Sequence, residues 1–137
     1  MSGSRRDARK LAVKGLYHWI INETDPQMIV DTLASEPEYK RADTFYLKNL
    51  LLVASKNAQS YLNTLLPLLD RPIAQLSPIE QSIFLIAMVE LRDESDVPFK
   101  VVINECVELT KLYGGSDGYK YVNGVLDRYL KGLREKV

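Results

Sequence analysis

The sequence contains few of the residues that catalytic and metal-binding sites most often use. Its 137 residues include one histidine and one cysteine. One cysteine cannot form an internal disulfide, which is typical of a protein of the reducing cytoplasm. His18 lies between Tyr17 and Trp19, and Cys106 lies on the apolar side of its segment. We therefore expect Cys106 to be a buried packing residue and His18 a packed or surface imidazole, and we expect neither a histidine-rich metal site nor a Ser-His-Asp triad.

Long apolar runs and phosphate-binding motifs are also missing. No apolar run reaches the roughly 18 residues of a membrane-spanning helix, and the N-terminus has no apolar signal-peptide segment. The glycine-rich segment 114–118 lacks the Lys-Ser/Thr pair and the preceding strand of a P-loop. These absences predict a cytoplasmic protein that is not an enzyme and needs neither a metal nor another cofactor.

Charge is balanced over the whole chain but not along it. There are 18 lysines and arginines and 18 aspartates and glutamates. Residues 1–14 carry an excess of four positive charges and residues 119–137 an excess of three, so the remaining residues carry an excess of seven negative charges. Clustered cations favour binding of a polyanion, because its counterions are released. The alternative is a pair of basic tails exposed to solvent.

Hydrophobic residues recur with the helical period along nearly the whole chain, and no segment alternates like a strand. The pattern predicts an all-α protein, a compact bundle of about six or seven helices that forms one domain over residues 1–137. Phe45 and Phe99 are expected in its core. Pro67 predicts that the apolar segment 43–69 is two helices or one kinked helix, because proline is unfavourable inside a helix. Helices are expected over residues 5–22, near 28–34, over 43–69, from 78 to 91, from 98 to 113 and after 117.

Three segments carry signals for the ends of helices. Ser77-Pro78-Ile79-Glu80 predicts a helix N-terminus with a capping box, in which Ser77 and Glu80 each bond the other's backbone amide. Gly114-Gly115 predicts a helix end, since glycine tolerates the left-handed conformation common there. Ser116 or Asp117 is expected to cap the last helix.

The first predicted helix has two distinct faces. Opposite its expected core face lies a stripe of Arg6, Lys10, Val13 and Tyr17. An aromatic ring with two cations suits single-stranded RNA or a partner protein. The alternative is a helix buried on two sides, with Tyr17 inside the fold. The expected core face consists of Ala8, Leu11, Ala12, Gly15, Leu16 and Trp19.

The last predicted helix also combines an aromatic ring with cations. Tyr121 and Arg128 lie two turns apart and off the core face, with Lys120 farther round on the exposed side. A ring flanked by cations predicts a platform on which a nucleobase stacks. The alternative is that Tyr121 covers the edge of the core.

Two strings near the C-terminus give the sequence a family resemblance. They are DVPFKVVINE, residues 96–105, and YVNGVLD, residues 121–127. Together with the Arg5-Arg6-Asp7-Ala8-Arg9 start, they resemble the NusB family of bacterial transcription antitermination factors. The resemblance runs from the first predicted helix to the last.

The resemblance implies an all-helical protein that binds the boxA element of nascent single-stranded RNA. It implies joint binding with a small ribosomal subunit protein, NusE, in a complex on RNA polymerase that suppresses termination, notably over ribosomal RNA operons. By the same resemblance, Tyr17 and Glu80 match positions at or near the partner-protein surface. The positions matching residues that lie at or alongside RNA are Arg5, Arg6, Arg9, Lys10, Asp117, Lys120 and Tyr121.

Two carboxylates fit poorly with this RNA assignment. Asp7 interrupts the arginine run, and Asp117 adds negative charge where phosphate is expected to pass. Both predict modest affinity of the chain alone, with the partner supplying much of the rest. The alternative function is a helical protein-interaction module without direct RNA binding. Self-association as a homodimer through the same surface is left open by the sequence.

Overall fold

The computed structural model describes residues 3–93, 96–115 and 117–135. This part of the chain is all-α, as expected, and contains no strand, only an isolated bridge between Ser4 and Ala42. Three short 3-10 helices accompany the α-helices: η1 (Pro37–Lys40), η2 (Leu66–Leu68) and η3 (Ile73–Gln75). The α-helices are α1 (Arg5–Asn22), α2 (Pro26–Leu33), α3 (Thr44–Leu65), α4 (Pro78–Arg92), α5 (Phe99–Tyr113) and α6 (Gly118–Glu135).

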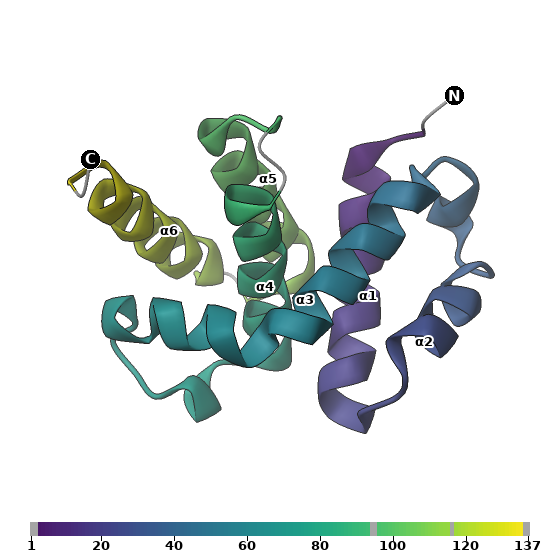
Figure 1. Ribbon diagram of the computed structural model, residues 1–137, viewed down its shortest axis with the longest axis horizontal. Coiled ribbons are helices and arrows are strands. Elements are labelled where there is room, and N and C mark those ends of the chain that lie inside the picture. The colour runs from purple at the N-terminus through teal and green to yellow at the C-terminus, as the bar shows by residue number, and fades with distance from the viewer. Residues whose placement is uncertain (1–2, 94–95, 116, 136–137) are drawn as a thin grey trace.

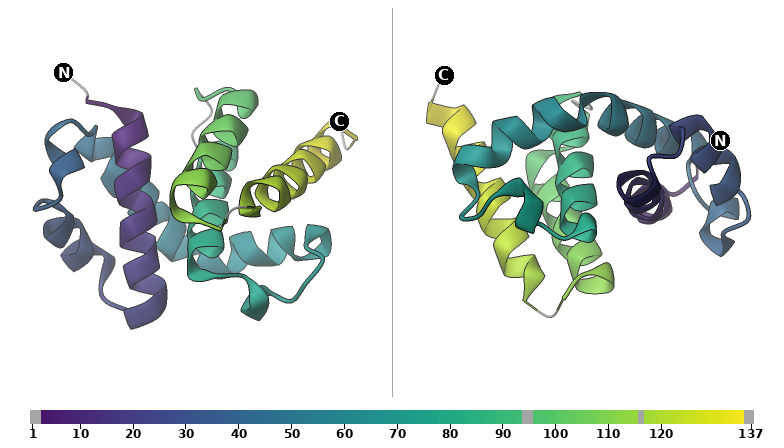
Figure 2. Two further views of the ribbon diagram at one scale, coloured as in Figure 1. Left: turned by 180° about the vertical axis from the view of Figure 1, so that it is seen from behind. Right: turned by 90° about the horizontal axis from the view of Figure 1, so that it is seen from below.

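Helix α4 is the centre of the structure. Every residue from 82 to 91 is buried, as expected for a helix that is covered on all sides. It packs against α1, α3 and α5, and α6 packs mainly against α5. Helices α1 and α5 run in the same direction, and α4, which packs against both, runs in the opposite direction (Figure 1). Helix α3 crosses the front of the molecule in Figure 1 and therefore lies at the back in the left view of Figure 2.

The N-termini of α1 and α3 are joined by backbone and capping hydrogen bonds. Ser4 caps α1 by accepting a hydrogen bond from the Asp7 amide, at 3.0 Å. The Ser4 amide donates to the Arg41 carbonyl and the Ser4 carbonyl accepts from the Asp43 amide. Asp43 in turn caps α3 through the Tyr46 amide, at 3.0 Å. Segments 4–9 and 41–46 are therefore held together.

The signals for helix ends were partly right. The capping box at Ser77 is confirmed. The prediction of two helices in the 43–69 segment is confirmed, since α3 ends at Leu65 and Pro67 lies at the start of the separate 3-10 helix η2. Gly114 ends α5 in an extended conformation, with φ of −96°. Among the described residues, the one with a left-handed backbone conformation is Glu23, directly after α1. Ser116 lies outside the described residues.

Three predictions about burial need correction. Val13 is fully buried, since α1 packs against α3 and α4 and is covered on two sides. Phe99 is 39% exposed in the first turn of α5. Phe45 is 83% exposed near the start of α3, although its segment was expected to bury it. Among the described helices, none is both long and apolar enough to cross a membrane.

Candidate nucleic-acid interface

A buried ionic network lies under the arginine-rich start, which comprises Arg5, Arg6, Arg9 and Lys10. The Arg9 guanidinium donates two hydrogen bonds of 2.7 Å to the Glu90 carboxylate on α4. The Tyr46 hydroxyl on α3 donates to the same carboxylate at 2.5 Å. Burial alone would lower the pKa of Arg9, but the hydrogen bonds and charge of Glu90 raise it. Arg9 is 5% exposed. It is therefore a structural residue whose guanidinium cannot reach RNA in this conformation.

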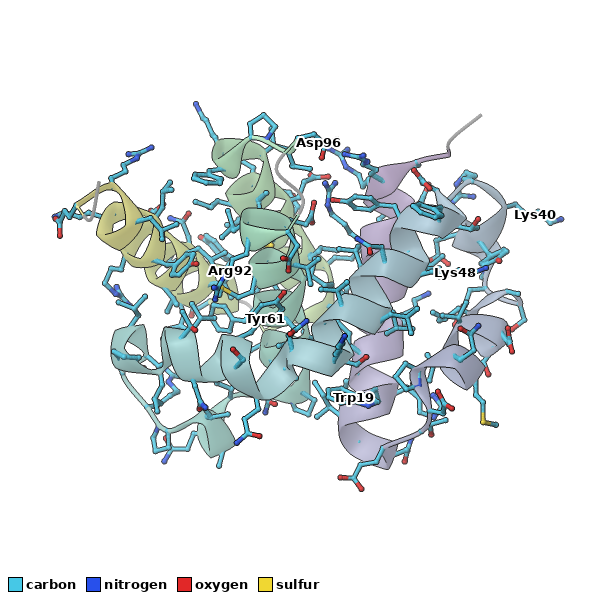
Figure 3. All side chains as sticks on the ribbon, viewed as in Figure 1. Trp19, Lys40, Lys48, Tyr61, Arg92 and Asp96 are labelled. Carbon is cyan, nitrogen blue, oxygen red and sulfur yellow. The ribbon has the colours of Figure 1, made fainter. Side chains whose placement is uncertain are left out.

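The other two arginines of this start are more exposed and also paired with carboxylates. Arg6 donates to both oxygens of Glu105 on α5, at 3.1 and 3.2 Å, while 71% of its side chain stays exposed. Glu105 raises the pKa of Arg6 through these hydrogen bonds. Arg5 bonds Asp96 at 3.1 Å, and its guanidinium lies 4.3 Å from the centre of the Tyr46 ring. Figure 3 shows Asp96 at the end of the molecule where α1 begins.

A groove of about 600 Å³ lies between α1 and α5. Lys10 lines it and makes no ion pair within the described part of the chain. Leu112, in the last turn of α5, extends it toward α6 and is 55% exposed. The groove thus begins among cations and ends on an apolar side chain. Its lining consists of Arg6, Arg9, Lys10, Asn104, Glu105, Val107, Glu108, Leu109 and Leu112.

Beyond the end of α5, two cations face an aromatic ring that the sequence had not singled out. The Lys111 ammonium lies 4.9 Å and the Lys120 ammonium 6.0 Å from the centre of the Tyr119 ring. The Lys111 ammonium is 3.6 Å from Glu108, which lines the groove, so this cluster borders the groove. A ring between two ammonium groups is the combination that had been predicted at Tyr121. The signal in the sequence was Tyr119 beside Lys120, with Lys111 one turn before the glycines.

Tyr121 itself packs on the edge of the core, as the alternative had it. Its ring meets Phe84 edge-on, with ring centres 6.1 Å apart. Its other side is covered by Arg71, whose guanidinium lies 4.2 Å from the ring centre. Arg71 is held by Asp70 at 2.8 Å. A nucleobase could stack on Tyr121 only after Arg71 moves.

The two carboxylates that fitted poorly with RNA lie in different surroundings. Asp7 is mostly buried and bonds Arg41 at 3.3 Å, so its charge is already compensated by a cation. Asp117 is exposed just before α6, and its carbonyl accepts a hydrogen bond from the Lys120 amide. Asp117 is therefore the one whose charge would oppose phosphate.

The two residues predicted to meet a partner protein differ in their surroundings. Tyr17 is 43% exposed on α1, and Ile21, one turn later, is 53% exposed. The Glu80 carboxylate accepts a hydrogen bond from the Ser77 amide at 2.9 Å, so it serves the capping box. Because α1 and α4 are antiparallel neighbours, the end of α1 and the start of α4 lie at the same end of the molecule (Figure 1).

The structure therefore separates the predicted site residues into groups. Arg6, Lys10 and the mostly buried Arg9 line the groove, Arg5 lies beside Asp96 and Tyr46, and Lys120 lies in the Tyr119 cluster. Tyr121 lies on the core edge, and Tyr17 lies toward the other end of α1. Among the described residues, no three His, Cys, Asp or Glu side chains are placed to hold a metal ion.

Comparison with known proteins gives one consistent family. The sequence profile of the NusB family matches residues 6–131. The transcription antitermination protein NusB of Thiobacillus denitrificans is 46% identical over 134 residues, which cover 98% of this chain and 92% of that protein.

Solved structures agree. The chain superposes on T. maritima NusB with a TM-score of 0.85 and 27% identity, covering 96% of this chain and 93% of that one. It also superposes on a structure of the antitermination factors NusB and NusE in complex with double-stranded RNA. There the TM-score is 0.84 and the identity 26%, covering 93% of this chain and 96% of that one.

Proposed function

This chain belongs to the NusB family, and we propose that it is a transcription antitermination factor that binds boxA-type single-stranded RNA together with the small ribosomal subunit protein NusE. The family is one of RNA-binding transcription factors without enzymatic activity, in agreement with the sequence. We infer that the protein works in the cytoplasm, within the antitermination complex on RNA polymerase. Ribosomal RNA operons are its proposed targets.

The observation that carries the RNA assignment is the groove lined by Arg6 and Lys10, which the Tyr119 cluster borders through the contact of Lys111 with Glu108. Phosphates require cations, and unstacked bases require flat or apolar surfaces. Arg6 and Lys10 supply cations at one end, and Lys111 with Lys120 supplies them at the other. Leu112 and Tyr119 supply apolar and aromatic surface between them. An RNA strand lying along α5 would meet these groups in turn.

We assign the NusE contact to the opposite end of α1. Tyr17 and Ile21 expose apolar surface there, near the start of α4 where Glu80 lies. Aromatic and aliphatic side chains surrounded by polar groups are typical of the centre of a protein interface. Glu80 then acts by shaping the first turn of α4, with its carboxylate in the capping box.

The test is a binding assay with fluorescent boxA-like RNA over a salt series, with and without NusE. We expect modest affinity for the chain alone, because Arg5 and Arg6 must exchange carboxylates for phosphates. Added NusE should raise the affinity. The logarithm of the affinity should fall with the logarithm of salt by about 0.7 for each phosphate contact to a single strand. An RNA duplex of the same sequence, included because a relative was crystallised with one, should bind less tightly.

The competing function is a protein-interaction module without direct RNA contact. If RNA binding is undetectable even with NusE present while NusE itself binds, that alternative is correct. With each ligand measured in the absence of the other, Lys10→Glu should weaken RNA binding and leave NusE binding unchanged, and Tyr17→Ala should have the opposite effect. Loss of both functions in either variant would contradict the assignment of two separate surfaces.

A further inference from the structure

Phe45 is a large apolar side chain on a well-formed helix that the fold leaves in water. It lies in the first turn of α3 and is 83% exposed, whereas its neighbour Tyr46 is 4% exposed. Single exposed apolar residues are common and need no explanation by themselves. What matters at Phe45 is the chemistry of the side chains around it.

Phe45 belongs to a segment that is joined to the arginine-rich start. Segment 41–46 is hydrogen-bonded to segment 4–9 through Ser4, Arg41 and Asp43. The next residue, Tyr46, lies under the Arg5 guanidinium at 4.3 Å. The backbone of Phe45 is thus held next to the segment that carries Arg5 and Arg6, by contacts that do not involve its own side chain.

Exposed cations precede and follow Phe45 in the chain, and α3 itself carries no carboxylate. Lys48 is three residues later, on the same side of α3, and is exposed without an ion pair in the described part of the chain. Arg41, four residues earlier, keeps 62% of its side chain exposed. From Thr44 to Leu65, α3 contains no aspartate or glutamate. The nearest carboxylates already have partners, since Asp43 caps the Tyr46 amide and Asp7 bonds Arg41.

We propose that Phe45 is a nucleobase-stacking residue, with Lys48 and Arg41 contacting the phosphates on either side of the stacked base. An exposed ring between cations matches a single strand, which presents flat bases and regularly spaced negative charges. An apolar protein surface would be matched by the ring but not by the cations. The inference rests on the proposed RNA-binding function and extends the RNA path from α1 onto the start of α3.

The test compares substitutions at Phe45 in the full chain with NusE present. Phe45→Ala should lower the affinity for boxA-like RNA roughly five- to hundredfold, the range found for loss of one stacked base. Phe45→Trp should retain the affinity, and Phe45→Leu, which is apolar but has no aromatic face, should not restore it. The matched control is Met28→Ala, because Met28 is 61% exposed on α2 but lies between Asp25 and Asp31. This control should bind RNA like wild type.

Two further measurements separate stacking from a structural effect. In a Trp19→Phe, Phe45→Trp variant, the only tryptophan is at position 45, and RNA should quench its fluorescence. Lys48→Gln should reduce the slope of affinity against salt by about 0.7, whereas Phe45→Ala should leave the slope unchanged.

Equal RNA affinity of wild type and Phe45→Ala would overturn the inference and leave the proposed function intact. No RNA binding by wild type would instead overturn the proposed function. If Phe45→Ala weakens NusE binding but not RNA binding, or if Phe45→Leu restores RNA affinity, the surface is an apolar protein contact and the inference is wrong.

Discussion

Glu90 is a carboxylate with almost no contact with water, and it accepts hydrogen bonds from two other helices. Arg9 on α1 and Tyr46 on α3 both donate to it from within the core. A buried ion pair of this kind adds little stability over an apolar substitute, but removing one partner leaves the other charge unpaired. Its main effect is to fix where α1, α3 and α4 meet, and so to place Arg5 and Arg6 at the surface.

We therefore predict that Glu90→Ala lowers the free energy of unfolding by roughly 3–5 kcal/mol, because the buried Arg9 charge loses both hydrogen bonds to Glu90 and keeps only the 3.2 Å bond to Glu105. Urea denaturation followed by circular dichroism measures this. Glu108→Ala is the control, since Glu108 is 66% exposed and only 3.6 Å from Lys111, and the loss there should be under about 1 kcal/mol. Similar losses in both variants would contradict the structural role given to Glu90.

Tyr119 and Tyr121 are predicted to have different roles. Tyr119→Ala should lower RNA affinity roughly five- to hundredfold and leave stability nearly unchanged, since its ring faces Lys111 and Lys120 and is outside the core. Tyr121→Ala should cost about 2 kcal/mol of stability, because its ring packs on Phe84. RNA binding by fluorescence anisotropy and urea denaturation are measured on both variants. The opposite pattern would restore Tyr121 as the stacking platform.

The sequence was sufficient to predict that an aromatic ring near α6 is flanked by cations, but not which ring. Helical spacing gives the side of α6 on which Tyr121 lies, and it does not reveal that Arg71, fifty residues earlier, covers that side. The same limit applies to Arg9. Its basic character was plain in the sequence, but its pairing with Glu90 depends on how α1 and α4 pack. Long-range contacts decided both cases.

At the scale of whole elements, the sequence predicted most helices well. The Ser77 capping box and the extent of α1 depend on residues within one or two turns, and both were right. Pro67 was also read correctly, because α3 ends before it and the start of the following 3-10 helix accommodates proline. Phe45 was misjudged because the apolar period of α3 begins one residue later, at Tyr46. Errors of this kind come from the ends of elements, where the period is weakest.

The attachment of η1 to α1 gives a prediction about pH. Lys14 on α1 donates to both Glu38 carboxylate oxygens, at 3.1 and 3.3 Å. The pKa of the Glu38 carboxyl is lowered from 4.5, because the carboxylate accepts a hydrogen bond from the Glu38 backbone amide and also bonds the Lys14 ammonium. The folded state thus favours the ionised form. The contribution of the ionised Glu38 carboxylate to the free energy of unfolding is fully present above pH 4.5 and is lost as the pH falls through the lower pKa of the folded state.

We predict that wild type is more stable than Glu38→Gln at pH 6, and that the difference shrinks toward zero below about pH 4. Urea denaturation at several pH values measures the difference. The control is the same substitution in a Lys14→Gln background, where the difference should be smaller at every pH. An unchanged difference in that background would show that the Lys14 ion pair is not its cause.

At the scale of the whole molecule, the uneven charge of the sequence is real but partly neutralised within the fold. The basic N-terminal segment lies against carboxylates of the acidic body, with Arg5 on Asp96, Arg6 on Glu105 and Arg9 on Glu90. Neither of the two alternatives inferred from the sequence describes this arrangement, since the arginine-rich start is neither an unpaired cationic patch nor a tail exposed to solvent. RNA must compete with these carboxylates for Arg5 and Arg6, which favours weak binding until a partner adds contacts.

This competition can be measured at Glu105. Glu105→Gln removes the charge that holds Arg6, and it also removes the charge 3.2 Å from Arg9, which keeps both of its hydrogen bonds to Glu90. We expect RNA affinity at low salt to rise roughly two- to fivefold, because Arg6 is 71% exposed and its pair with the mostly buried Glu105 is only partly screened. The slope of affinity against salt should steepen by up to about 0.7, as Arg6 gains a phosphate.

The control is Asp31→Asn, which removes one exposed negative charge on α2, away from the groove. It should change the affinity less than Glu105→Gln does and leave the salt slope unchanged. Equal effects of the two substitutions would mean that only net charge matters. A fall in affinity for Glu105→Gln, with the melting temperature unchanged, would mean that Glu105 holds Arg6 in the position that binds RNA, and that the carboxylate assists binding instead of opposing it.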